Sequence, residues 1–203
     1  MIVADRPVVG VLALQGDYEA HRAALAARGV ASVEVRTAAD LDGVAALVLP
    51  GGESTTMLKL MEGTGLAERL TAMIRGGVPA LATCAGVILL AREVSHPPQR
   101  SLGVLDVGVE RNAYGRQIDS AVVALEVADE KALGAAALEG VFIRAPRVVG
   151  VGPGVSVLAR RAGDPVLVRQ GNVLAATFHP ELTERSPVID LFLRPLRNGS
   201  SHP

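Results

Sequence analysis

The stretch VPALATCAGVILLA, residues 78–91, places the only cysteine of the chain, Cys84, between an apolar run and a helical pattern. Residues 80–83 predict a short buried strand, and residues 86–93 predict a helix that follows a turn of small side chains. Small residues on both sides of such a turn let a nucleophile project above a parallel sheet. We therefore expect an exposed Cys84 at the positive end of a helix dipole, which favours the thiolate.

The alternative for Cys84 is a packing role, because free cysteine is among the most buried residue types. A nucleophilic role needs a histidine nearby, and the segment TFHPE, residues 177–181, supplies His179 followed by Glu181. In an extended segment, residues two apart point to the same side, so Glu181 could orient His179 towards Cys84. These three residues are the candidate catalytic triad. The competing interpretation is a histidine at a strand end with a solvated glutamate.

Length and composition indicate one globular domain over residues 1–203, with residues 198–203 as a loose polar tail. The chain has 49% hydrophobic and 20% charged residues, and its apolar runs are far shorter than the ~18 residues that suggest a membrane span. The first six residues lack the apolar core of a secretory signal, so a cytoplasmic location is expected. A net charge of −1, without a basic run and with two tyrosines, three phenylalanines and no tryptophan, argues against nucleic-acid binding.

Strand and helix patterns alternate in the first half of the chain, which is typical of a doubly wound, mostly parallel α/β sheet. In such a sheet, functional sites gather at the carboxyl ends of the strands. The second half reads mostly as short additional strands before a last helix. The expected strands are 8–14, 30–35, 45–49, 80–83, 103–110, 118–127, 141–143, 148–151, 155–160, 165–169 and 173–177, and the expected helical segments are 18–28, 38–41, 86–93 and 188–196.

The segment PGGESTT, residues 50–56, follows the third predicted strand and opens a helix. Its two glycines let backbone amides approach a ligand where the helix dipole favours negative charge, so the segment is a candidate oxyanion hole. The alternative is an ordinary turn with Ser54 as the helix N-cap. A phosphate-loop interpretation is weak, because the Gly-x-x-x-x-Gly-Lys pattern is missing, and Gly150-Val151-Gly152 also fails the dinucleotide fingerprint. No cofactor is therefore expected.

Two arginines, Arg111 and Arg144, follow predicted strands and could bind the α-carboxylate of an amino-acid substrate. As an alternative, each could form an ordinary surface salt bridge. The remaining histidines, His21, His96 and His202, have no carboxylate or cysteine at metal-ligand spacing. No metal site is expected, and these three histidines remain unassigned.

Six segments together resemble the glutaminase subunits of pyridoxal 5'-phosphate synthases, and the resemblance spans nearly the whole chain. These subunits belong to the triad-type, class I glutamine amidotransferases, which share the cysteine and the His-Pro-Glu motif. The GGESTTM, ERN and FIRAP segments narrow the resemblance to this member of the class. The matching segments are LQG (14–16), PGGESTTM (50–57), TCAG (83–86), ERN (110–112), FIRAP (142–146) and FHPELT (178–183).

The resemblance implies a flavodoxin-like class I glutamine amidotransferase fold and hydrolysis of L-glutamine to L-glutamate and ammonia. The ammonia would pass through a protein interior to a barrel-shaped pyridoxal 5'-phosphate synthase subunit, within a large hetero-oligomer. It also implies Cys84 as nucleophile, His179 as general base and acid, and Glu181 as its orienter. The remaining implied site residues are the glutamine-binding positions Gly52, Glu53, Ser54, Arg111, Ile143 and Arg144 and the oxyanion donors Gly52 and Ala85.

Two further positions follow from the resemblance. Gln15 lies in a segment that faces the synthase in this family. Ala82 stands where the family usually has glycine, and its extra methyl group could tighten the elbow around Cys84; because alanine is the next smallest residue, we expect the change to be tolerated.

Two other functions stay open at this stage. A glutaminase of another biosynthetic pathway would keep the triad and the oxyanion loop but would serve a different synthase, and the segments 110–112 and 142–146 count against it. A non-catalytic partner that binds glutamine or a synthase without turnover is disfavoured by the intact set of Cys84, His179 and Glu181.

Overall fold

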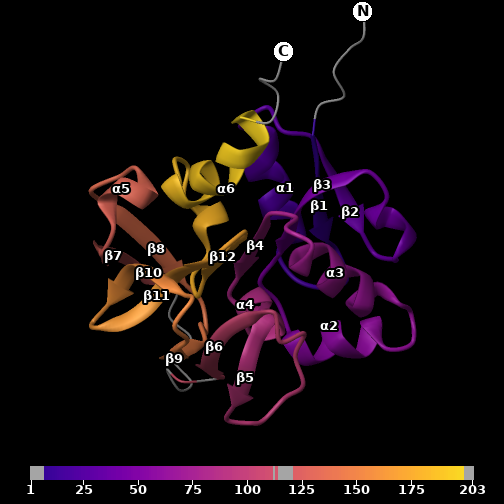
Figure 1. Cartoon of the computed structure of the whole chain (residues 1–203). Helices are drawn as coiled ribbons and strands as arrows, with labels where there is room; N and C mark the ends of the chain where they lie inside the picture. The colour runs from indigo at the N-terminus through magenta and orange to yellow at the C-terminus, as the bar shows by residue number, and fades with distance from the viewer. Residues whose placement is uncertain (1–6, 112, 114–120, 199–203) are drawn as a thin grey trace, which may run out of the picture.

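The computed structural model describes residues 7–111, 113 and 121–198, and its strands form two sheets (Figure 1). The nine-stranded sheet has the order β2-β1-β3-β4-β12-β11-β10-β7-β8, and the three-stranded sheet has the order β5-β6-β9. The strands are β1 (Val8–Leu12), β2 (Ser32–Val35), β3 (Val44–Leu49), β4 (Ala80–Thr83), β5 (Ala91–Ser95), β6 (Leu105–Glu110), β7 (Ala121–Val127), β8 (Leu138–Phe142), β9 (Arg147–Val151), β10 (Ser156–Arg161), β11 (Asp164–Gln170) and β12 (Val173–Ala176). The helices are α1 (Tyr18–Ala26), η1 (Ala39–Leu41), α2 (Ser54–Met61), α3 (Leu66–Arg75), α4 (Ala85–Leu90), α5 (Glu130–Leu133), η2 (Pro180–Leu182) and α6 (Pro187–Asn198).

The parallel part of the large sheet runs from β2 through β1, β3 and β4 to β12, and the strands beyond β12 pair antiparallel. All of those antiparallel strands come from the second half of the chain. The predicted doubly wound α/β sheet with additional C-terminal strands is therefore confirmed. β4 and β12 are neighbours although 93 residues separate Ala80 from Val173, so the carboxyl ends of the two strands meet.

Strand residues alternate between two apolar clusters, one on each face of the sheet, as the period of two requires. In β3, Leu47 and Leu49 belong to the cluster that α2, α3 and the small sheet cover. Ala46 and Val48 belong to the cluster under α1, α5 and α6. Figure 1 shows α1 and α6 together at one end of the molecule and β5 and β6 at the other.

The helix predicted over residues 86–93 is shorter in the structure, because α4 ends at Leu90 and β5 begins at Ala91. The backbone N–H groups of Leu102 and Val104 donate to the carbonyl oxygens of Leu89 and Leu90, at 2.7 and 3.0 Å. These bonds satisfy helix-end carbonyls from outside the helix, and Ala91 then pairs with Leu105 in the small sheet. Local periodicity could not reveal these distant partners.

Other boundaries differ by a few residues, and the helices α3, α5 and η2 were not predicted. The predicted strands 8–14 and 103–110 are reduced to β1 and β6, and the predicted helix 18–28 ends at Ala26. The longest of these is α3, whose buried Leu66, Leu70 and Ile74 repeat at a spacing of four. Residues 118–120 of the predicted strand 118–127 and residues 199–203 of the predicted tail lie outside the described part of the chain. Within the described part, no helix has both the length and the apolar character needed to cross a membrane.

Candidate active site

Cys84 sits at the carboxyl end of β4, in a strained backbone conformation with φ 47° and ψ −106°. Its backbone N–H donates to the carbonyl oxygen of Ala176 at 2.9 Å, so the neighbouring strand β12 holds the turn. Two residues later, Gly86 packs against β3: a Cβ at this position would lie 2.0 Å from the carbonyl oxygen of Leu49. Only glycine allows this approach, which places the start of α4 directly above the sheet.

Cys84 was predicted to be exposed, and this prediction is wrong, because the residue is only 7% exposed. The segment after β8 covers it: the sulfur Sγ lies 3.8 Å from the carbonyl oxygen of Ile143. Cys84 nevertheless lines a pocket, so the thiol is shielded from bulk water but faces a cavity.

His179 and Glu181 are in contact, with Nδ1 of His179 2.7 Å from Oε1 of Glu181. Both residues are buried, and the backbone N–H of His179 donates to the carbonyl oxygen of Val141 at 2.9 Å. This contact was predicted from an extended segment in which residues two apart share a side. That reason is wrong, because the segment is not extended. Glu181 lies in the 3₁₀ helix η2, which begins with Pro180, and this turn brings the carboxylate back to the ring.

The contacts of this pair determine the charge that each group carries. Burial alone would lower the pKa of His179, but the hydrogen bond and the charge of Cys84, together with Glu181, raise it to about 10. Burial would raise the pKa of Glu181, but its hydrogen bond with His179 and its contact with His21 lower it to about 2. At neutral pH the site therefore holds an imidazolium that Glu181 stabilises from one side, while Cys84 faces it from the other.

The segment after β3 packs directly against the imidazole of His179. A Cβ on Gly51 would lie 2.5 Å from Cε1 of His179, so a larger residue does not fit there. Gly52 has φ 149°, and the next N–H, that of Glu53, donates to Oε1 of Gln15 at 2.5 Å. Gln15 thereby holds the candidate oxyanion loop in place.

The N-cap of α2 is Glu53 and not Ser54, which was the alternative considered for this turn. The Glu53 carboxylate accepts hydrogen bonds from the backbone N–H groups of Thr55 and Thr56, at 3.2 and 2.7 Å. Burial alone would raise the pKa of Glu53, but these bonds and those of the two threonine hydroxyls lower it. Ser54 is buried, and its Oγ donates to the side-chain oxygen of Gln99 at 3.1 Å.

Arg111 lies beside the same helix start. Its Nη2 is 3.3 Å from Oε1 of Glu53 and 3.2 Å from Oγ1 of Thr55. Arg144 follows β8, with a positive φ of 45°, and is exposed. Both arginines line the pocket that contains Cys84, so they bring positive charge to one cavity from distant parts of the chain. Asn112 of the ERN segment lies outside the described residues.

The candidate residues meet in one pocket of about 280 Å³, at the lower end of the volumes that small ligands occupy. Every predicted nucleophile, base, oxyanion and glutamine-binding residue lines it, whereas Glu181 lies behind His179, outside the lining. Sequence reasoning missed Asp17, Ile88 and Pro146 as lining residues. The available signals were that Asp17 directly follows the quoted LQG segment and that Pro146 ends the quoted FIRAP segment. The lining residues are Gln15, Gly16, Asp17, Gly52, Glu53, Ser54, Cys84, Ala85, Ile88, Arg111, Ile143, Arg144, Pro146 and His179.

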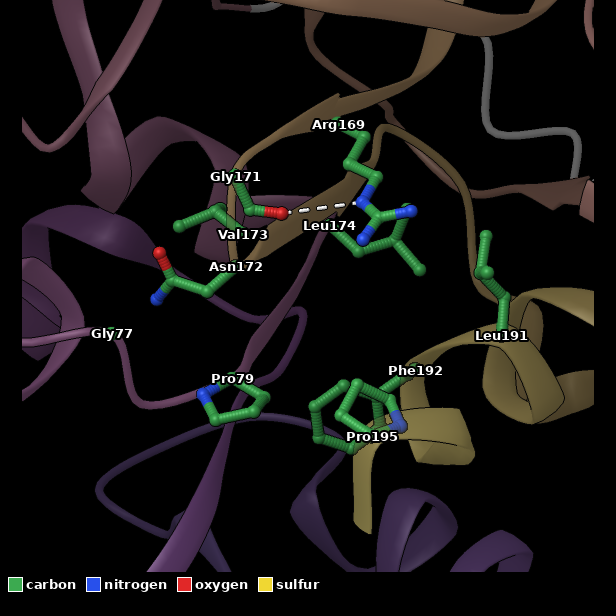
Figure 2. A pocket seen from close by; sticks show the side chains of 10 residues that line it. All are labelled: Gly77, Pro79, Arg169, Gly171, Asn172, Val173, Leu174, Leu191, Phe192 and Pro195. Carbon is green, nitrogen blue, oxygen red and sulfur yellow. Dashed lines mark hydrogen bonds between the residues drawn. The ribbon is translucent and has the colours of Figure 1, made fainter. Parts of the chain in front are cut away.

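Another pocket, of about 300 Å³, lies near the amino ends of β4 and β12, at the opposite end of these strands from Cys84 (Figure 2). Arg169 is the only charged residue among the ten that line it, and its Nε donates to the carbonyl oxygen of Gly171 at 3.2 Å. The lining offers neither a nucleophile nor a general base. Of these two pockets, only the one around Cys84 offers groups for nucleophilic chemistry.

Asp17, His179 and Glu181 are the one group of potential metal ligands found among the described residues, with ligand atoms within 4.8 Å of one another. Nδ1 of His179 already contacts Glu181 at 2.7 Å, whereas Asp17 is 3.8 Å from the same nitrogen and half-exposed. These distances fit an oriented imidazole better than a coordination shell, in which each ligand atom would point to a common centre.

Comparison with known proteins finds a family model that matches most of the chain. Residues 11–198 match the SNO glutamine amidotransferase family. The chain is 52% identical over 193 residues to the pyridoxal 5'-phosphate synthase subunit PdxT of Koribacter versatilis, covering 95% of this chain and 97% of that protein. It is 54% identical over 181 residues to the PdxT subunit of Thermus thermophilus, covering 88% and 92%.

Solved structures show the same architecture. A crystal structure of a glutamine amidotransferase superposes with a TM-score of 0.85 at 47% identity, covering 93% of this chain and 98% of that one. The structure of PurLQS from Thermotoga maritima has a TM-score of 0.71 at 18% identity, covering 94% and 99%. The second likeness concerns the fold alone.

Proposed function

Because the chain belongs to the SNO glutamine amidotransferase family, we propose that Cys84, His179 and Glu181 are the triad with which it hydrolyses L-glutamine. The chain is a glutaminase that releases L-glutamate and ammonia, and the ammonia supplies pyridoxal 5'-phosphate synthesis. One observation carries the assignment of the triad: His179, hydrogen-bonded to Glu181 at 2.7 Å, lines the same pocket as the strained, shielded Cys84.

The proposed reaction proceeds through a thioester. The Cys84 thiolate attacks the side-chain amide carbon of glutamine, and the backbone N–H groups of Gly52 and Ala85 stabilise the oxyanion. His179, which is protonated at neutral pH, gives its proton to the departing nitrogen, so that ammonia leaves and a γ-glutamyl thioester remains. A water molecule, deprotonated by His179, then attacks the thioester, and glutamate and the thiol are released.

The amino-acid end of glutamine is proposed to bind at the charged part of the pocket. Arg111 and Arg144 bring positive charge for the α-carboxylate, and Glu53 brings negative charge for the α-ammonium group. Glu53 is suited to this role although it caps α2, since its side chain is still 49% exposed. Ser54 and the backbone of Ile143 complete the proposed set of binding positions.

The ammonia is proposed to pass to a barrel-shaped synthase subunit within a large hetero-oligomer. The names of the relatives support a synthase partner, since each of the two quoted above is called a subunit of pyridoxal 5'-phosphate synthase. The segment with Gln15 is the proposed contact, because Gln15 lines the pocket and its side chain holds the loop at Glu53. A partner that touches this segment would also act on the oxyanion loop.

Ammonia release by the purified chain tests this function, with and without a pyridoxal 5'-phosphate synthase subunit and with Cys84→Ala as the control. We expect glutamine-dependent release that rises when the synthase is added, and no release by the folded Cys84→Ala variant. Release that survives this substitution would show that another residue is the nucleophile. If the folded chain binds the synthase but never releases ammonia, it is instead a non-catalytic partner.

A further inference from the structure

One buried ionisable side chain close to the triad has no role in the reaction described above. His21, on α1, is 2% exposed and does not line the pocket, so it touches neither substrate nor solvent. A buried histidine of this kind requires polar partners, since an unpaired imidazole inside a core is costly. Its partners lie on two other segments of the chain.

The Nε2 atom of His21 contacts two residues beside the active site, Thr83 and Glu181. It is 2.9 Å from Oγ1 of Thr83, the residue before Cys84 in the chain. It is also 3.3 Å from Oε2 of Glu181, the carboxylate oxygen that does not contact His179. A ring proton on Nε2 suits both contacts, since an ionised carboxylate can only accept and the hydroxyl of Thr83 can also accept.

The contact with Glu181 involves an atom that has no other partner. Oε2 of Glu181 is buried and makes no hydrogen bond of good geometry among the described residues, and Nε2 of His21 lies 3.3 Å from it. The side chain of Glu181 is fully buried. Without His21, this buried carboxylate oxygen would lose its contact with the imidazole, and the carboxylate would be held less firmly in its orientation towards His179.

We propose that His21 is a positioning residue of the triad: it holds Glu181 from the side opposite His179 and ties it to Thr83, at the base of the nucleophile turn. α1 packs against η2, so a rigid helix carries this contact. The inference rests on the proposed function, because it assigns His21 to the same glutaminase site. It also gives α1, which starts just after the pocket residue Asp17, a direct connection to the triad.

Two substitutions separate positioning from packing. His21→Leu fills the space without a donor, whereas His21→Gln places an amide N–H close to the position of Nε2. We expect His21→Leu to lower kcat for glutamine hydrolysis, measured in the complex with the synthase subunit, by about 10- to 100-fold, as misplaced catalytic groups do. The KM for glutamine should stay within about twofold, because His21 is not in the pocket, and His21→Gln should recover most of the activity.

Alkylation of Cys84 by iodoacetamide, followed by mass spectrometry on the chain alone, provides a readout that does not need turnover. We expect slower alkylation in His21→Leu than in the wild type, and recovery in His21→Gln. Circular dichroism and thermal melting verify folding, and His21→Asn, whose amide is too short to reach Glu181, replaces the leucine variant if that variant does not fold.

The possible outcomes distinguish a failure of the role proposed for His21 from a failure of the proposed glutaminase function. Wild-type kcat and alkylation in the folded His21→Leu variant would overturn the role of His21, as would a glutamine variant no better than leucine. A wild-type complex without Cys84-dependent ammonia release would contradict the proposed function instead. In that case the alkylation rates would still decide whether His21 positions the residues around Cys84.

Discussion

The imidazole of His179 links the nucleophile of the proposed triad to its carboxylate. His179 faces Cys84 in the pocket and contacts Glu181 behind it, and its pKa of about 10 reflects both neighbours acting against burial. A raised pKa of this size keeps a proton available for the departing ammonia at neutral pH. The carboxylate is therefore part of the proton chemistry, although it never meets the substrate.

Substituting Glu181 by glutamine tests whether the carboxylate supports proton transfer by His179. Glu181→Gln removes the charge that stabilises the imidazolium but keeps the size of the side chain, so we expect kcat to fall by roughly 10²- to 10⁴-fold. Steady-state ammonia release measures the effect, and the exposed Glu184→Gln is the matched control, with activity like the wild type. A Glu181→Gln enzyme with wild-type kcat would remove Glu181 from the triad.

The methyl group of Ala82 does not strain the backbone of the elbow around Cys84. The residue lies inside β4, is completely buried, and belongs to the apolar cluster under the small sheet, whereas the positive φ belongs to Cys84. We expect Ala82→Gly to leave kcat within about twofold. It should lower the free energy of unfolding by about 1–2 kcal/mol, through lost strand stiffness and a lost buried methyl group. Urea unfolding measures this change, and a clear gain in activity would show that the methyl group does strain the elbow.

At the level of secondary structure, the position of α4 depends on one close approach. Gly86→Ala would place a methyl group 2.0 Å from the carbonyl oxygen of Leu49, in the backbone of β3, which cannot move aside without disrupting the sheet. We expect a loss of at least about 1–3 kcal/mol in the free energy of unfolding, together with a loss of glutaminase activity. Gly154→Ala is the control, because nothing lies within 4 Å of its added Cβ. Equal stability of the two variants would contradict this packing.

The sequence predicted most elements whose signal is local, although it missed α3, and it missed features that depend on distant partners. The strand 80–83 and the turn at Cys84 follow from an apolar run and small residues, whereas the contact of His179 with Glu181 was predicted from an extended segment and is made by the turn of η2. The early end of α4 depends on the N–H groups of Leu102 and Val104, which lie thirteen and fourteen residues beyond the carbonyls that they bind. The shielding of Cys84 depends on Ile143, and the contact of His21 with Glu181 joins residues 160 positions apart. Neither leaves a periodic pattern that could be read from the chain.

The proposed active site forms only where segments that are distant in the sequence meet in the folded chain. The pocket takes residues from the ends of β1, β3, β4, β6 and β8 and from the segment after β12. The sheet order places β4 beside β12, and the hydrogen bond of His179 to Val141 adds β8 to the same assembly. Global unfolding therefore separates Glu181 from the groups that keep it ionised, which links the protonation of this carboxylate to the stability of the chain.

This linkage predicts a specific acid sensitivity. The pKa of Glu181 is lowered from 4.5 to about 2, because its contacts with His179 and His21 outweigh the opposing effect of burial. A lowered pKa contributes stability that is fully present above about pH 4.5 and is lost as the pH falls towards 2. Glu181→Gln cannot titrate there, so its free energy of unfolding should fall less between pH 5 and pH 3 than that of the wild type or of Glu184→Gln. Urea unfolding at these two pH values measures the difference, and parallel losses in all three proteins would show that Glu181 titrates normally in the folded chain.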